Sequence, residues 1–194
     1  MNVKPRYRTR GLMTEETFSN VLKWVKAFPP KDILALHVFG EPLLHPKFDL
    51  YALELSKLCM VTFSTNATYL NESWADRLSQ IPFEWISVSN WDKSAKERAA
   101  GLLIQRNIPV RYPPNDPTHD WASQSSGGPH KVKMEYGCEF LREGKAVIRW
   151  NGDIATCCIS DRAEDVWGNV SMEPGSVSIG SYDLCEKCHL NKGG

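Results

Sequence analysis

The sequence predicts an α/β protein, in which a partial parallel (β/α) barrel is followed by a small cysteine-rich β-hairpin domain that binds a cluster. Two observations support this fold class. Helical and strand-like patterns alternate from residue 14 to residue 112 with short connections, which favours parallel strands joined by right-handed crossovers. Five of the six cysteines then fall between residues 138 and 188. The expected strands are too few for a closed eight-stranded barrel, which takes about 250 residues.

The first half of the alternating segment contains two expected helices and two expected strands. Thr14 is placed to cap a helix that ends at Pro29-Pro30. The apolar run 33–39 has the length of a buried strand, residues 48–58 have helical spacing, and 60–64 is the next strand. The apolar face of the first helix is formed by Phe18, Val21, Leu22, Val25 and Phe28.

The second half repeats the same order. Asn71 is placed to cap a helix, and the run 85–89 is a strand. Ser94 and Glu97 have the spacing of a capping box, which predicts that a helix starts there and runs through Asn107. The strand 108–112 completes the set. Functional residues in such folds lie at the carboxyl ends of the strands, which directs attention to residues 40–42, 64–66 and 87–90.

The rest of the chain has a different character. Residues 113–130 are rich in Pro, Gly, Ser and Asp and are typical of a linker. Residues 147–157 alternate around Asn151-Gly152, a strong signal for a β-hairpin turn. We therefore predict a barrel domain at 1–117, a linker at 118–136 and a cluster-binding domain at 137–194. A module with so little core needs a staple, which the cysteines can supply.

The bulk composition excludes several classes of protein. The 23 Lys and Arg residues balance the 23 Asp and Glu residues, so nothing in the charge indicates a nucleic-acid or membrane partner. No apolar run approaches 18 residues, and the basic N-terminus lacks the hydrophobic region of a secretory signal. We expect a cytoplasmic protein, in which clustered cysteines are metal ligands rather than disulfides.

The cysteine spacing is C-x18-C-C-x26-C-x2-C. Cys185 and Cys188 can reach one metal centre from a single turn. Neighbouring residues of a strand point to opposite faces, so only one of Cys157 and Cys158 should face that centre, and the spacing leaves open which one. Four thiolates suit either tetrahedral zinc or an iron–sulfur cluster. Cys59, at the end of an apolar helix, is expected to be a core residue.

Nearly the whole chain resembles radical S-adenosylmethionine (AdoMet) proteins that carry a C-terminal SPASM-type auxiliary cluster domain. The resemblance is carried, in chain order, by RGLMTEETF, FGEPLLHPKF, STNATYL, ISVSNWDKS, HDWAS, CEF, IRWNGDIATCC, WGNV and LCEKCHL. It implies that Gly40 and Glu41 belong to a turn that holds the amino group of AdoMet, and that Thr65, Asn66 and Ser87 line this cofactor.

The resemblance also favours iron–sulfur over zinc. It implies that one auxiliary 4Fe–4S cluster is held by Cys138, Cys157, Cys185 and Cys188. Simpler interpretations exist for the barrel positions. Gly40-Glu41-Pro42 could be an ordinary strand-end turn, Asn66 could bond its own backbone, and Ser87 could be a plain strand residue.

The sequence departs from the family pattern in three ways. The CxxxCxxC triplet that holds the AdoMet-cleaving cluster is absent, Ala67 replaces the usual Gly, and Ser89 stands where Asp is common. Our first hypothesis is therefore that the chain is part of a radical enzyme acting on a peptide or small substrate, with the triplet supplied by another segment or by a partner chain. A missing edge strand also leaves an exposed barrel edge, which we expect a partner chain to cover. The alternatives are a non-catalytic relative, in which the cluster is a structural or interaction element, and a zinc-stapled module.

Overall fold

The structure, a computed structural model, describes residues 10–38, 40–89, 93–112, 139–157, 165–181 and 185. It divides into two compact units, Leu22–Pro114 and a second unit made of Met1–Val21 with Asn115–Gly194. None of the helices in the described ranges is long and apolar enough to cross a membrane.

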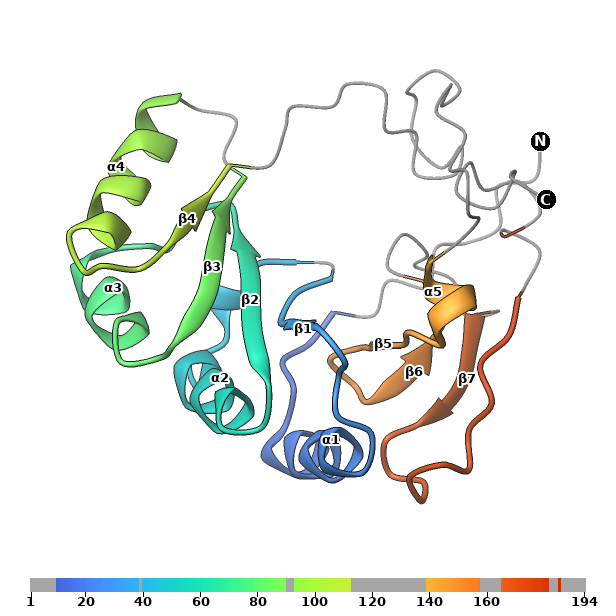
Figure 1. Ribbon diagram of the computed structural model, residues 1–194. Coiled ribbons are helices and arrows are strands. Elements are labelled where there is room, and N and C mark those ends of the chain that lie inside the picture. The colour runs from blue at the N-terminus through green and yellow to red at the C-terminus, as the bar shows by residue number, and fades with distance from the viewer. Residues whose placement is uncertain are drawn as a thin grey trace. The chain divides into compact units, whose positions relative to one another are not determined.

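The unit Leu22–Pro114 is built on a four-stranded sheet (Figure 1). Its strands are β1 (Ile33–Ala35), β2 (Met60–Thr65), β3 (Phe83–Val88) and β4 (Val110–Arg111), and they lie in this order in space. Every neighbouring pair is parallel. The predicted parallel arrangement is therefore confirmed for these strands, while their place in a partial barrel stays a prediction.

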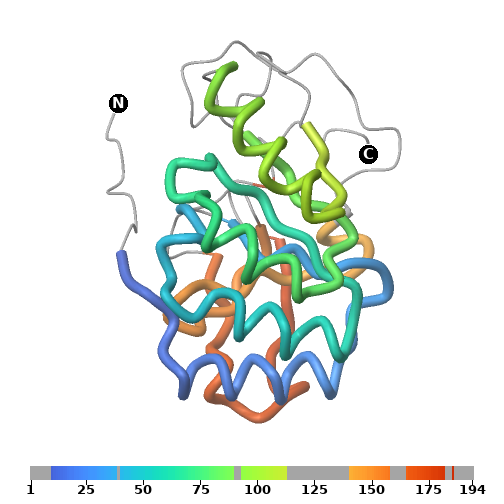
Figure 2. Tube along the Cα trace, turned by 90° about the vertical axis from the view of Figure 1, so that its left-hand side faces the viewer, coloured from blue at the N-terminus to red at the C-terminus, as the bar shows by residue number. Residues whose placement is uncertain are grey.

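Helices cover one face of this sheet. In both views α2 (Phe48–Ser56), α3 (Glu72–Leu78) and α4 (Lys93–Ile104) lie side by side on the same face, in chain order (Figures 1 and 2). Phe63 on β2 touches the ring of Phe48 on α2, with ring centroids 4.7 Å apart. The fully buried side chains of the strands face this layer: Val61, Phe63, Ile86 and Val88.

The opposite face of the sheet is more polar. A register shift between Val61 and Thr62 places Val61 opposite Phe83 but Thr62 opposite Trp85. This bulge turns Trp85 away from the Phe63 face, because two residues of β3 oppose one step of β2. The face opposite the helices therefore carries Thr62, Ser64, Trp85, Ser87 and Arg111.

Two of the predicted helix caps are confirmed and one is wrong. The amide of Thr17 donates to Thr14 Oγ1 at 3.1 Å in front of α1 (Glu15–Ala27), and that of Trp74 donates to Asn71 Oδ1 at 2.9 Å. Ser94 does not start α4, because Lys93 is already helical and Ser94 lies inside the helix. The spacing of Ser94 and Glu97 resembles a capping box but does not fix where a helix begins.

Strand β1 is shorter than the predicted run 33–39. The amide of Leu36 still donates to the Thr62 carbonyl at 2.7 Å, but the next β2 amide, that of Ser64, donates to the ring of His37 at 3.1 Å. A side chain thus replaces the backbone at this point, and the regular ladder ends at Ala35.

The other unit contains a second sheet. It is antiparallel, in the order β5 (Val147–Ile148), β6 (Asp153–Ala155) and β7 (Val166–Asn169), and α5 (Glu139–Glu143) precedes it. The predicted hairpin at Asn151-Gly152 is confirmed. Its turn is not the two-residue type, because the Gly152 amide bonds to the Arg149 carbonyl at 2.9 Å and only Gly152, at φ +87°, has a positive φ.

The residues before α1 pack on this hairpin. A Cβ built on Gly11 would lie 2.2 Å from Cζ3 of Trp150, in the hairpin turn. The backbone of the RGLM segment therefore lies directly against the indole, and no side chain fits between them. The predicted linker 118–136, with Cys138, Cys158 and Cys188, lies outside the described residues.

Candidate functional site

The predicted AdoMet residues lie around the carboxyl ends of β1, β2 and β3. Gly40 and Glu41 follow β1, Thr65 ends β2, Asn66 follows it, and Ser87 is the penultimate residue of β3. Carboxyl ends of parallel strands meet at one edge of the sheet, which is where open α/β sheets bind ligands.

Glu41 joins the turn after β1 to the end of β2. Its Oε1 accepts hydrogen bonds from the Leu43 amide at 3.1 Å and from the Thr65 hydroxyl at 2.8 Å. Its Oε2 accepts one from the Asn66 amide at 2.7 Å. The side chain also caps the short helix η1 (Pro42–Leu44). This carboxylate therefore positions the turn, since three donors from two segments converge on it.

Thr65 is buried, and its hydroxyl both donates and accepts a hydrogen bond. Besides donating to Glu41, Oγ1 accepts the amide of Ala67 at 2.9 Å. The Thr65 carbonyl accepts from both the amide and the hydroxyl of Ser89, at 2.9 and 3.2 Å. Thr65 thereby ties the ends of β2 and β3 to the Glu41 turn.

The structure explains the residue types at two further positions, Asn66 and Gly40. Asn66 is exposed, and its Oδ1 accepts the amide of Thr68 at 2.9 Å, which is the local backbone bond expected of an Asx turn. Gly40 has φ +97° with open space around its Cα, so a side chain there would be strained by conformation rather than by crowding. The turn 40–42 is thus both a strand-end turn and the segment that Glu41 fixes.

The polar face of the sheet adds residues that sequence patterns did not single out. Ser87 is opposite Ser64 on one side and Arg111 on the other. The exposed guanidinium of Arg111 stacks over the Trp85 ring, 3.4 Å from its centroid. Such a stacked, planar guanidinium suits a carboxylate or phosphate. The sequence patterns did not indicate Arg111, because its stacking depends on the direction of Trp85, which the bulge between β2 and β3 sets.

His37 is the other residue that was missed. Its Nδ1 accepts the Ser64 amide at 3.1 Å, and burial lowers the pKa of its imidazole. The available signal was a histidine inside the apolar run 33–39, which is an unusual position for a titratable group.

In the second unit, Cys157 directly follows the last residues of the hairpin and is half-buried, while Cys185 is buried. Within the described ranges, no three His, Cys, Asp or Glu side chains come together as a metal site. Two of the four predicted ligands are therefore placed, and the assignment of all four stays a prediction.

The residue before Cys157 is firmly held. Thr156 is 1% exposed, its hydroxyl donates to the Gly180 carbonyl at 2.8 Å, and it accepts Trp167 Nε1 at 2.6 Å. The Thr156 amide reaches the carbonyl of Asp165 at 3.3 Å. Asp165, fully buried, also pairs with Arg149 at 2.6 Å. These bonds fix the backbone where Cys157 leaves the sheet.

Residues of the motifs IRWNGDIATCC and WGNV form one hydrogen-bond network around the hairpin turn. The side-chain nitrogen Nδ2 of Asn169 donates to the Asn151 carbonyl and to Asp153 Oδ1, both at 3.1 Å. Asn169 Oδ1 accepts the backbone amide of Ser171 at 3.1 Å. Asn151 Nδ2 donates to Asp153 Oδ2 at 2.8 Å. A Cβ on Gly152 would lie 2.8 Å from Val170 Cγ2. The signature therefore braces the hairpin turn against β7.

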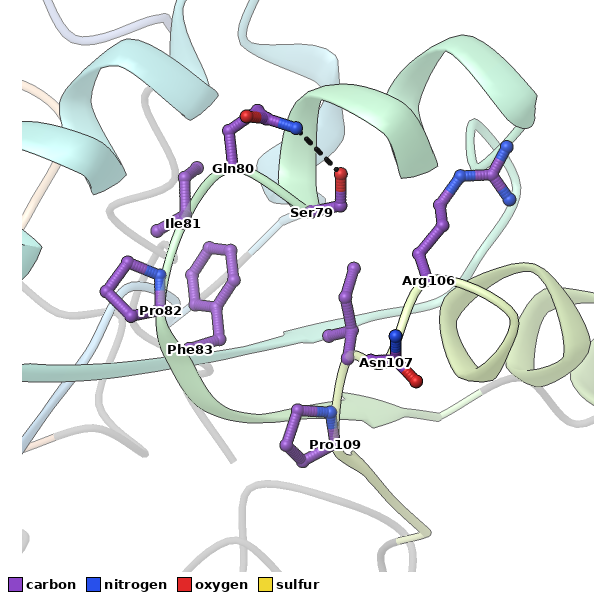
Figure 3. Close-up of a pocket in the computed structure, with 9 residues that line it drawn as sticks. Ser79, Gln80, Ile81, Pro82, Phe83, Arg106, Asn107 and Pro109 are labelled. Atoms are coloured by element: carbon purple, nitrogen blue, oxygen red, sulfur yellow. Dashed lines mark hydrogen bonds between the residues drawn. The ribbon is translucent and has the colours of Figure 1, made fainter.

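A hollow of about 370 Å³ lies at the other end of the parallel sheet, where β3 and β4 begin (Figure 3). Gln80 at its rim donates to Ser79, and the Arg106 guanidinium points away from the hollow toward α3, where it pairs with Glu72 and Asp76. Amino-terminal ends of parallel strands usually serve stability. We do not assign the site to this hollow.

No family model matches the sequence, and no curated protein matches it. Solved structures do. BtrN in complex with AdoMet and 2-DOIA is similar, with a TM-score of 0.66, 17% identity, and 87% of this chain and 70% of BtrN covered. An open conformation of BtrN gives a TM-score of 0.56 at 18% identity over 93% of this chain and 71% of that one.

Native anSMEcpe with bound AdoMet is also similar, with a TM-score of 0.65 at 16% identity, and 96% of this chain and 81% of anSMEcpe covered. At these identities the likeness shows the fold alone, so this chain shares the fold of BtrN and anSMEcpe over the part that aligns.

Proposed function

We propose that this chain binds AdoMet at the carboxyl ends of β1 to β4, as part of a radical SAM-type iron–sulfur protein. One observation carries the proposal: the three hydrogen bonds accepted by Glu41 hold the Gly40-Glu41 turn against the end of β2, at the edge where such sheets bind ligands. The AdoMet bound to BtrN and anSMEcpe supports the choice of ligand.

The residues present fit the chemistry of AdoMet. Its carboxylate suits the guanidinium of Arg111, which is exposed and stacked on Trp85. Its ammonium group suits the oxygen acceptors of the Gly40-Glu41 turn. Bound AdoMet would supply an activated sulfonium, and the residues named here would bind and orient it.

Isothermal titration of the whole chain with AdoMet tests this site directly. We expect binding that weakens about tenfold in Arg111→Gln, because a charge-assisted hydrogen bond is lost. Arg98→Gln, which alters an exposed arginine of α4, is the matched control and should bind like the wild type. A wild-type chain that does not bind millimolar AdoMet would contradict the proposal.

The same proposal assigns Cys138, Cys157, Cys185 and Cys188 to one 4Fe–4S cluster, with zinc as the alternative. The donor set supports it, since four thiolates suit such a cluster, which supplies electron transfer or structural support when bound. After anaerobic purification we expect about four irons and four sulfides per chain. Stoichiometric zinc without sulfide would favour the zinc-stapled module instead.

Radical chemistry also needs a CxxxCxxC triplet, which this sequence does not contain. We therefore propose that the chain modifies a peptide or small substrate only when another segment or partner chain supplies that triplet. The chain alone, with dithionite and AdoMet, should yield no 5′-deoxyadenosine by chromatography. Production of 5′-deoxyadenosine would show that no second source is needed.

A non-catalytic function is the second candidate, favoured by the absent triplet. In that case the cluster is a structural or protein-interaction element. Retention of AdoMet binding distinguishes the two, since a purely structural protein has no need for the cofactor.

The partner proposal concerns β1, which lies at an edge of the described sheet. Unpaired strand edges readily accept a further strand. We propose that a partner chain or another segment pairs there. The amides of Ile33 and Ala35 point to the open edge, since that of Leu36 points to β2. A monomer in light scattering whose Ile33 and Ala35 amides exchange slowly would count against a partner chain, because its own residues would then cover the edge.

A further inference from the structure

The ring of His37 stands where a backbone carbonyl would lie in a regular parallel ladder. The Leu36 amide bonds to the Thr62 carbonyl at 2.7 Å, so a regular continuation would direct the Ser64 amide to the Leu36 carbonyl. Instead, the Ser64 amide donates to His37 Nδ1 at 3.1 Å. The side chain therefore extends the junction of β1 and β2 past the end of β1.

Glu41 repeats this arrangement two residues later, directly after the end of β2. Its carboxylate accepts the amide of Asn66 at 2.7 Å. The amides of Ser64 and Asn66, which point the same way from the strand, are thus both taken by side chains of the segment that follows β1. His37 and Glu41 form a two-point clamp on the end of β2.

The protonation state of His37 follows from this geometry. A ring nitrogen that accepts a hydrogen bond carries no proton, so the neutral imidazole has its proton on Nε2. Burial lowers the pKa of His37, which also favours the neutral form. Ser64, the donor, lies on the polar face of the sheet next to Ser87.

We propose that His37 is a positioning residue for the AdoMet site, with Nδ1 holding the segment 37–41 on the end of β2 so that the Gly40-Glu41 turn keeps its place. The role rests on the proposed function, because the turn matters to a ligand only if AdoMet binds there. Glu41 alone fixes one end of this segment, and His37 fixes the other.

Two amide-bearing variants test the proposal. The Asn oxygen of His37→Asn reaches the position of Nδ1, whereas the longer Gln side chain of His37→Gln places its amide near Nε2. Both are polar and uncharged, so they differ chiefly in whether the Ser64 amide keeps an acceptor. Hydrogen exchange of the Ser64 amide and AdoMet affinity are measured on the whole chain, with exchange of the Phe63 amide as the folding control.

In His37→Gln we expect faster exchange at Ser64 and an AdoMet affinity about tenfold weaker, the effect of one lost hydrogen bond at a partly buried site. His37→Asn should restore both to near wild-type values. Equal loss of affinity in the two variants would overturn the positioning role.

The outcome is separable from failure of the proposed function. If the wild-type chain does not bind AdoMet, both the proposed function and the role of His37 toward AdoMet are wrong. Hydrogen exchange of the Ser64 amide then still tests whether His37 holds the end of β2. Loss of its protection in His37→Gln but not in His37→Asn supports the clamp, and unchanged protection in both overturns it.

Discussion

Glu41 shows how a single residue positions the candidate site. Its carboxylate accepts two backbone amides and one hydroxyl, from Leu43, Asn66 and Thr65. Because hydrogen bonds to a charged acceptor are among the stronger ones, this side chain holds two strand-end segments together.

Replacement of Glu41 by Ala leaves three donors without this acceptor. We expect the free energy of unfolding of the parallel-sheet unit to fall by about 2 kcal/mol. Urea unfolding followed by circular dichroism measures it. Glu54→Ala is the matched control, since Glu54 on α2 is exposed and, among the described residues, pairs only with Lys57 just after the helix; its effect should stay within about 0.5 kcal/mol. Equal effects of the two substitutions would contradict a positioning role for Glu41.

Ala67 occupies a conformation that suits glycine. It has φ 61°, in the left-handed region that L residues rarely adopt, and it is fully buried. A left-handed conformation costs an L residue roughly 1–2 kcal/mol. The alanine therefore keeps its methyl contacts at the expense of backbone strain.

A larger, β-branched residue should not be tolerated at this position. We expect Ala67→Val to lower stability by about 2 kcal/mol or more, from conformational strain and overpacking together. Ala67→Gly should be nearly neutral, because relief of strain offsets the loss of a buried methyl, worth about 0.8 kcal/mol. Thermal unfolding of the two variants checks this, and a neutral Ala67→Val would mean that the loop shifts to accept it.

At the scale of elements, the hairpin β5–β6 depends on a residue of β7. Asn169 bonds to both sides of the turn through one amide group, and Val170 donates to the Gly152 carbonyl at 2.9 Å. A turn with so few ladder bonds of its own is marginal without such support.

Asn169→Ala should loosen this turn specifically. We expect hydrogen exchange of the Val170 amide to rise about tenfold, since the loss of bonds worth roughly 1–2 kcal/mol raises local opening. Ser171→Ala is the control, because the backbone amide that bonds to Asn169 is kept. No change at Val170 in Asn169→Ala would show that the strands, and not the amide bridge, hold the turn.

At the scale of the whole molecule, the chain has two compact units, and five of the six cysteines belong to one of them. The sixth, Cys59, is a free thiol that directly precedes β2 in the parallel-sheet unit, and burial raises its pKa. Metal loss should therefore affect the two units unequally.

Cys185→Ser tests this expectation. We expect loss of bound iron and a lower stability of the cysteine-rich unit, because metal binding and folding are coupled in small metal-binding modules. Hydrogen exchange of β2 and β3 amides should stay unchanged. Cys59→Ser is the matched control and should keep its iron. Loss of protection in both units would show that they fold as one cooperative body.

Local patterns in the sequence determined the helices, the parallel strands, the caps at Thr14 and Asn71, and the hairpin at Gly152. These features depend on periodicity and on contacts a few residues apart, so sequence alone could predict them. The segments that carry Gly40, Glu41, Thr65 and Asn66 were also predictable, because strand ends follow from the strand pattern. The start of α4 was not, since the Ser94 spacing is too weak a signal.

Only the tertiary structure decided what these residues do to one another. The clamp on β2 joins Glu41 to residues 24 and 25 positions away and His37 to one 27 positions away. The bulge that turns Trp85 toward Arg111 depends on how two strands register. Such pairings are set by packing between distant segments, and no local pattern encodes them.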